Sequence, residues 1–228
     1  MSWNFTKTEE LIELAKVVSK HDGIYVSHMR SETRGIFKAL EELFQIAREA
    51  DVRAEISHIK LAGQASWGQT AQALGMIERA RAEGLDVTQD QYMYPASSTG
   101  IQNRIPTWAR EGGRSKFKER VADSETKARI IAEMKESLEK YGHKNFDYAM
   151  IASYSHDPSL NGMNVMEAAK KIRKSDSLDD QIEMILEINA NGGASGVFHS
   201  MSETDLIAYL RHPNTMIAAD SGIRLWQK

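Results

Sequence analysis

The sequence predicts an α/β protein built on a parallel sheet or barrel. Two short apolar runs, at residues 24–29 and 54–59, each end in a Ser-His pair, with one amphipathic helical segment between them. His28 and His58 are thus about 30 residues apart, which is the length of one βα unit. A third apolar run, at 86–92, follows another helical segment. Helices and strands alternate with short connections, which is typical of parallel sheets.

The remaining elements follow in chain order. Apolar residues at helical spacing predict helices that begin at Thr8, after Thr33 and at Thr70. Residues 93–100 combine small side chains with a proline and are expected to form a loop near a site. A short helix near Trp108 and a charged helical stretch at 116–141 come next, and the charges are expected to face solvent. Strands are predicted at 148–154, 197–201 and 215–219, and helices at 164–174, at 179–189 and from Ser202.

Bulk properties exclude several classes of protein. The 228 residues include 27% charged and 41% hydrophobic residues, with a formal net charge of −3. This balance is ordinary for a globular protein and indicates neither a nucleic-acid partner nor a membrane surface. The absence of cysteine excludes disulfides and thiolate metal ligands. No apolar run approaches the roughly 20 residues that span a bilayer, and the N-terminus does not resemble a signal peptide, so we expect a cytoplasmic protein.

The two Ser-His pairs indicate a metal site. The carboxyl ends of neighbouring parallel strands meet at one edge, where such folds build their sites, so His28 and His58 can share one ion. Each taken alone has a simpler explanation as a satisfied core or loop histidine. Asp220 ends an apolar strand and is expected at the same edge as ligand and general base, although a helix cap or Asx turn explains it equally well. Arg30 and Lys60 each follow a histidine by two residues and could bind a substrate carboxylate, but for Arg30 a surface ion pair is the preferred interpretation.

Five segments in the same order resemble the N-acyl-D-amino-acid deacylases of the metal-dependent amidohydrolase superfamily. They are residues 25–32, 55–60, 94–99, 200–203 and 211–220. The resemblance implies a (β/α)₈ barrel of which this chain holds strands five to eight. The whole chain, 1–228, is then one incomplete barrel domain with a helical insertion at about 101–145.

The resemblance also implies residue roles. His28, His58 and Asp220 match zinc ligands, and Asp220 matches the residue that activates the attacking water. Lys60, Tyr92 and Ser98 match residues that hold the substrate carboxylate, and Met201 matches a pocket-lining side chain. The family's His-x-His pair and cysteine have no counterpart in this sequence. We therefore expect a fragment that binds zinc weakly or not at all and is inactive alone.

The expected activity of the intact site is hydrolysis of the amide bond of a small N-acyl-D-amino acid by a metal-activated water. Two alternatives stay open. One is another amidohydrolase, such as a cyclic-amide hydrolase of the dihydroorotase kind. Lys60 discriminates between the two activities, because a free carboxylate on the substrate needs a cation. The other is a non-catalytic half-barrel that binds a metabolite or a partner chain. Because half a barrel leaves unpaired edges and an uncovered sheet face, we also expect a homo-oligomer.

Overall fold

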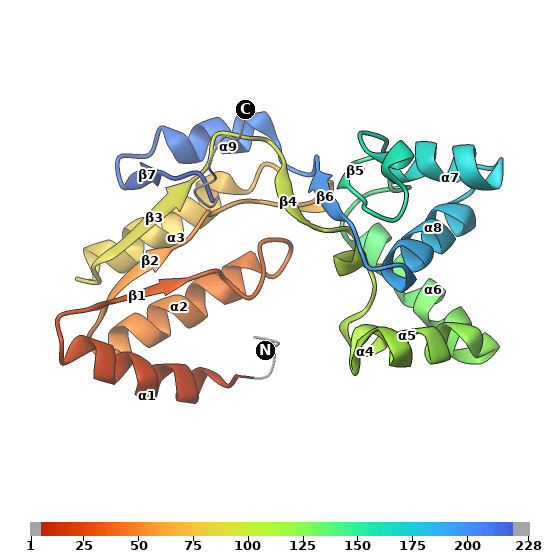
Figure 1. The fold of residues 1–228 in the computed structure, drawn as a ribbon. Helices are drawn as coiled ribbons and strands as arrows, with labels where there is room; N and C mark the ends of the chain where they lie inside the picture. The colour runs from red at the N-terminus through yellow and green to blue at the C-terminus, as the bar shows by residue number, and fades with distance from the viewer. Residues whose placement is uncertain (1–5, 221–228) are drawn as a thin grey trace, which may run out of the picture. The chain divides into compact units, whose positions relative to one another are not determined.

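A computed structural model describes residues 6–220 of the chain (Figure 1). The chain divides into two compact units, one formed by Met1–Pro95 with Met201–Lys228 and the other by Ala96–Ser200. The second unit includes the range expected for a helical insertion, about 101–145, and it contains three strands as well as helices. Within the described residues, no helix is both long and apolar enough to cross a membrane.

The first unit is built on a four-stranded sheet. Its strands are β1 (Ile24–Ser27), β2 (Arg53–Ile56), β3 (Val87–Gln91) and β7 (Thr215–Ile217), in the order β1-β2-β3-β7. All three pairings are parallel, as the alternation of helices and strands predicts. Strand β7 returns beside β3 although the whole second unit separates them in sequence. The assignment of these strands to a barrel stays a prediction.

Helices cover one face of this sheet (Figure 1). They are α1 (Thr8–Ser19), α2 (Ile36–Ala50), α3 (Thr70–Ala82) and α9 (Glu203–Leu210), and a 3₁₀ turn, η2 (Gln64–Ser66), precedes α3. Leu40 of α2 and Ile77 of α3 are fully buried against Ile56 and Val87 of the strands. The buried apolar residues of α2 recur every three or four positions. They therefore form one continuous face that packs against the strands.

The opposite face of the sheet carries a different set of side chains. The parallel register places Val26, Glu55 and Thr88 side by side, with Asp90 and Met216 further along the same face. Val26 is 56% exposed and Met216 is 51% exposed. Strands β1 and β7 are the two edges of the sheet. Parallel strands are normally covered on both faces, but among the described residues of this unit the helices lie on the other face; here the edge strands expose apolar side chains, while Glu55 of the central β2 is buried.

The second unit has an antiparallel sheet in the order β4-β6-β5, formed by β4 (Ser97–Gly100), β6 (Ser195–Phe198) and β5 (Ala149–Ser153). Its helices are α4 (Thr107–Arg110), α5 (Gly113–Ala122), α6 (Ser124–Lys140), α7 (Val165–Arg173) and α8 (Leu178–Ala190), with 3₁₀ turns η3 (Ile101–Arg104) and η4 (Pro158–Leu160). Phe117, Ile130, Ile151 and Ile185 lie in its core.

The expectation of a loop throughout 93–100 is wrong, because Ser97–Gly100 forms strand β4. Its Ser-Ser-Thr-Gly sequence has no apolar alternation to indicate a strand. The pairing partner, β6, lies almost 100 residues further along the chain and supplies the hydrogen bonds.

Candidate metal centre

Two imidazoles face each other where neighbouring parallel strands end. His28 follows β1 and His58 follows β2, and Ser27 and Ile56, the last residues of those strands, are register partners. His28 Nδ1 lies 2.8 Å from His58 Nε2, and the ring centroids are 4.5 Å apart at 64°. His58 is 9% exposed, whereas the His28 side chain is 68% exposed. The structure thus brings together the two histidines that the sequence pairs, although their role as ligands stays a prediction.

A third group, Glu32, completes the cluster and was missed in the sequence. Its Oε1 lies 2.9 Å from His58 Nδ1 and 3.7 Å from His28 Nδ1. Among the described residues, the one group of three with metal-binding side chains in mutual reach is His28, Glu32 and His58, with ligand atoms within 4.8 Å of one another. Glu32 follows His28 by four residues in a loop, where this spacing has no helical meaning. The sequence therefore offered no clear signal for it.

Lys60 joins the cluster from the buried side. Its Nζ lies 2.5 Å from Glu32 Oε1 and 2.6 Å from His58 Nδ1, and its side chain is 4% exposed. Burial lowers the pKa of Lys60, while the carboxylate of Glu32 opposes that shift. Burial works to raise the pKa of Glu32, but the His58 hydrogen bond and the Lys60 charge outweigh it and hold the pKa below its ordinary value. Each partner thus favours the charged form of the other, although both are largely removed from water.

Tyr92 and Met201 lie together beside this cluster. The Tyr92 hydroxyl is 3.6 Å from the Met201 sulfur, and both residues pack with Leu206. The Tyr92 ring centroid is 6.5 Å from that of His58 and 5.4 Å from Lys60 Nζ. Burial raises the pKa of Tyr92, and the charges of Glu32 and Asp220 add to the rise, so the phenol stays protonated and can donate. The substrate-binding role of Tyr92 and the pocket-lining role of Met201 stay predictions.

Asp220 approaches the same cluster from the end of β7. It adopts a left-handed backbone conformation with φ of 48° and interacts electrostatically with His28, Lys60 and Tyr92. It is not part of the close group formed by His28, Glu32 and His58. Ser98 lies on β4 of the second unit. The roles expected for Asp220 and Ser98 stay predictions.

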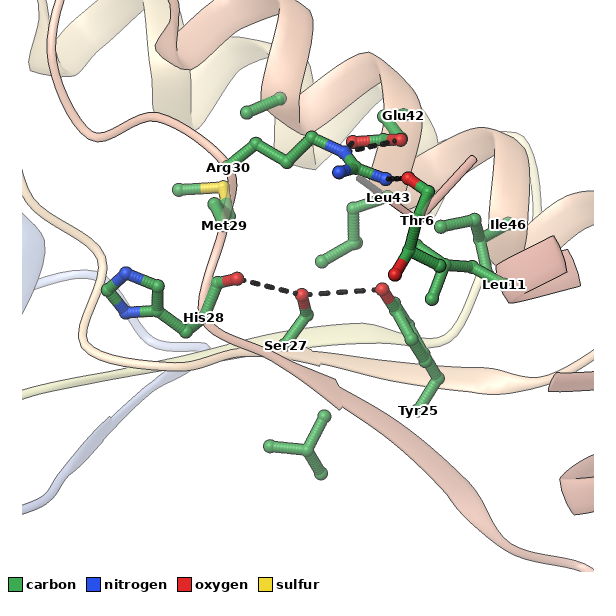
Figure 2. A pocket seen from close by; sticks show the side chains of 12 residues that line it. Thr6, Leu11, Tyr25, Ser27, His28, Met29, Arg30, Glu42, Leu43 and Ile46 are labelled. Atoms are coloured by element: carbon green, nitrogen blue, oxygen red, sulfur yellow. Dashed lines mark hydrogen bonds and ion pairs between the residues drawn. The ribbon is translucent and has the colours of Figure 1, made fainter. Parts of the chain in front are cut away.

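A cavity of about 280 Å³ lies beside β1 and α2, next to the cluster (Figure 2). Arg30 lines it and forms an ion pair with Glu42 at 2.7 Å, so the preferred interpretation of Arg30 as an ion-pair residue is correct. The Tyr25 hydroxyl donates to Ser27, which donates to the His28 carbonyl oxygen. His28 borders the cavity, whereas His58, Glu32 and Lys60 do not. The cavity is therefore a neighbour of the cluster and not its pocket.

Comparison with known proteins identifies proteins to which the chain is similar. No protein-family model matches it. A D-aminoacylase of Alcaligenes xylosoxydans xylosoxydans is 48% identical over 99 residues, which are 43% of this chain and 20% of that protein. A solved structure of D-aminoacylase, described by the role of its binuclear metal centre, matches with a TM-score of 0.62 and 29% identity. That match covers 92% of this chain and 35% of the D-aminoacylase chain. The chain is similar to the N-acyl-D-amino-acid deacylases over part of their length.

The resemblance stated from the sequence is thereby confirmed, together with its partial extent. The chain spans roughly a third of the length of these deacylase structures. An N-acyl-D-glutamate deacylase from Bordetella bronchiseptica, solved with zinc and a phosphonate inhibitor, has the similar fold. Its TM-score is 0.67 at 22% identity, covering 95% of this chain and 36% of that one. The helices and parallel strands of this chain thus follow the α/β fold of the deacylase structures.

Proposed function

We propose that this chain supplies part of the active site of a metal-dependent hydrolase that cleaves the amide bond of N-acyl-D-amino acids. The observation that carries the proposal is the pair of imidazoles, His28 Nδ1 and His58 Nε2, at 2.8 Å on neighbouring parallel strand ends. The relatives named D-aminoacylase and N-acyl-D-glutamate deacylase support the substrate class. The small molecule would be bound at this edge of the first unit.

The donor set fits a divalent metal such as zinc. His28 and His58 each offer a ring nitrogen toward the other, and Glu32 offers a carboxylate oxygen; nitrogen and oxygen donors of this kind suit zinc. A bound zinc ion supplies Lewis-acid chemistry, which polarises a carbonyl and activates water. With three groups at hand and no cysteine, we expect weak binding compared with a closed four-ligand site.

The chain's own residues then divide the remaining work. Asp220 would take a proton from the attacking water and pass it to the leaving amine, as expected of a carboxylate that acts as general base and acid. Lys60 and Tyr92 would hold the substrate carboxylate, and Met201 would line the pocket. The same role, which the resemblance implies for Ser98 of the second unit, stays a prediction. Lys60 is already paired with Glu32. A substrate carboxylate would therefore share the ammonium group through its other N–H donors instead of meeting a free cation.

Zinc uptake tests the proposal directly. We expect purified chain, dialysed against zinc and analysed for metal, to retain zinc, and His28→Ala and His58→Ala each to lose it. His21→Ala is the matched control, because His21 is exposed at the end of α1 and outside the cluster. Equal zinc content in the wild type and in the His28→Ala/His58→Ala double variant would contradict the proposal.

A further inference from the structure

The chain leaves strand β2 in an unusual way at His58. The β2–β3 ladder ends with the pair Ile56 and Gln89, and the chain turns at Ser57 and His58. His58 has a φ of 42°, in the left-handed region that residues with a Cβ rarely adopt. A residue that leaves a ladder in this conformation loses the backbone acceptor that its N–H would otherwise meet. The direction of the His58 ring therefore depends on what holds its backbone.

Asp90 of β3 provides that hold. Its Oδ1 accepts a hydrogen bond from the His58 backbone N–H at 2.7 Å, and its own carbonyl oxygen accepts from Ile59 N at 2.9 Å. On the other side, Ser57 N donates to the Ser27 carbonyl oxygen of β1 at 3.0 Å. Three consecutive amides, 57 to 59, are thus fixed to the two neighbouring strands. The amide of His58, the middle residue, is held by the side chain of Asp90.

Asp90 also interacts with two other charged groups. Its negative charge acts on Lys60, and it raises the pKa of Glu55 further after burial has raised it. Thr88, two residues earlier on the same face, donates its hydroxyl to Glu55. Asp90 is thus the acidic residue of this face that reaches the histidine turn, and Thr88 is its natural control.

We infer that Asp90 is a positioning residue: its carboxylate oxygen holds the left-handed turn at His58 and so directs the imidazole toward His28. This inference rests on the proposed function only where it concerns metal. The geometry of the two rings can be measured without metal. The required property is a hydrogen-bond acceptor at one place, and not a negative charge.

Two conservative variants separate these properties. Asp90→Asn keeps an acceptor oxygen at the same distance along the side chain and removes the charge, whereas Asp90→Glu keeps the charge and displaces the oxygen by one methylene. In metal-free chain, we expect a nuclear Overhauser effect between the His28 and His58 ring protons in the wild type, in Asp90→Asn and in Thr88→Ala. We expect Asp90→Glu to lose it while its circular dichroism stays that of the wild type.

Zinc affinity, measured by competition with a chromophoric chelator, should follow the same order. Asp90→Glu should bind about 10- to 100-fold more weakly, as is typical when a group supporting a ligand is displaced, and Asp90→Asn should match the wild type. An unchanged ring contact in Asp90→Glu, or its loss in Asp90→Asn, would overturn the inference. If the wild type binds no zinc but the ring contacts follow the expected order, the proposed metal function fails and the positioning role stands.

Discussion

Removing the charge of Glu32 should destabilise the first unit, because it removes the carboxylate that pairs directly with the buried Lys60. The Lys60 side chain is 4% exposed and that of Glu32 is 17% exposed, so both are largely withdrawn from water. Truncating one partner of a buried ion pair typically costs about 3–5 kcal/mol. We take about 3 kcal/mol for Glu32→Gln, the lower end, because the amide oxygen still accepts a hydrogen bond from Lys60.

The measurement is the free energy of unfolding in urea of metal-free chain, followed by NMR signals of the first unit. At a denaturant slope of about 1–3 kcal/mol/M, a loss of about 3 kcal/mol lowers the midpoint by about 1 M or more. Glu13→Gln is the matched control, since Glu13 pairs with Lys16 on an exposed helix surface at 2.8 Å. Exposed pairs contribute little, so the control midpoint should stay within experimental scatter.

The double variant Glu32→Gln/Lys60→Met decides whether the cost is that of an unpaired charge. Replacing both partners of a buried pair is often neutral, so the double variant should recover most of the lost stability. A double variant as unstable as Glu32→Gln alone would refute the reasoning. Since the pKa of Glu32 is lowered in the folded chain, its contribution is present above its unfolded pKa. That contribution should be lost as the pH falls through the lowered value.

Three further predictions concern other parts of the chain. Burial lowers the pKa of His143, whose ring centroid lies 3.8 Å from that of Tyr148, so the unfolding midpoint should fall as the pH drops below about 6.5. The variant His143→Phe should show a smaller fall, and an equal fall would contradict the prediction. Light scattering should give a mass above that of one 25.6 kDa chain, because β1 and β7 are the edge strands of the sheet among the described residues; the mass of one chain across a wide concentration range would exclude a homo-oligomer. The chain alone should not hydrolyse N-acetyl-D-amino acids, and turnover that Asp220→Asn abolishes would show a complete site.

Much of the first unit could be predicted from local pattern. Helix α2 and the strands that precede His28 and His58 follow from apolar periodicity and from turn residues at their ends. The two histidines could be paired because parallel strands of successive units must lie side by side. Strand β4 could not be predicted, because its pairing with β6 depends on a partner almost 100 residues away.

The contacts of Glu32 and Asp90 with His58 could not be predicted from the sequence for a similar reason. Each acts through a contact with His58 across the fold, Glu32 from the loop after β1 and Asp90 from β3. A loop carboxylate and a carboxylate within a strand look in sequence like ordinary solvated charges. What distinguishes them is the burial of their partner, and burial depends on how the strands are ordered in space.

The charges around His58 argue for an order of binding. Among the described residues, the carboxylates of Glu32 and Asp220 act on this cluster, against the ammonium of Lys60. Two carboxylates against one ammonium leave an excess of negative charge that repels a substrate carboxylate and attracts a divalent cation. A bound cation would offset that excess and weaken the pairing of Lys60 with Glu32. The Lys60 ammonium could then attract a substrate carboxylate more strongly. We therefore expect the site to bind metal first, and the chain without metal to have little affinity for any anionic amino-acid derivative.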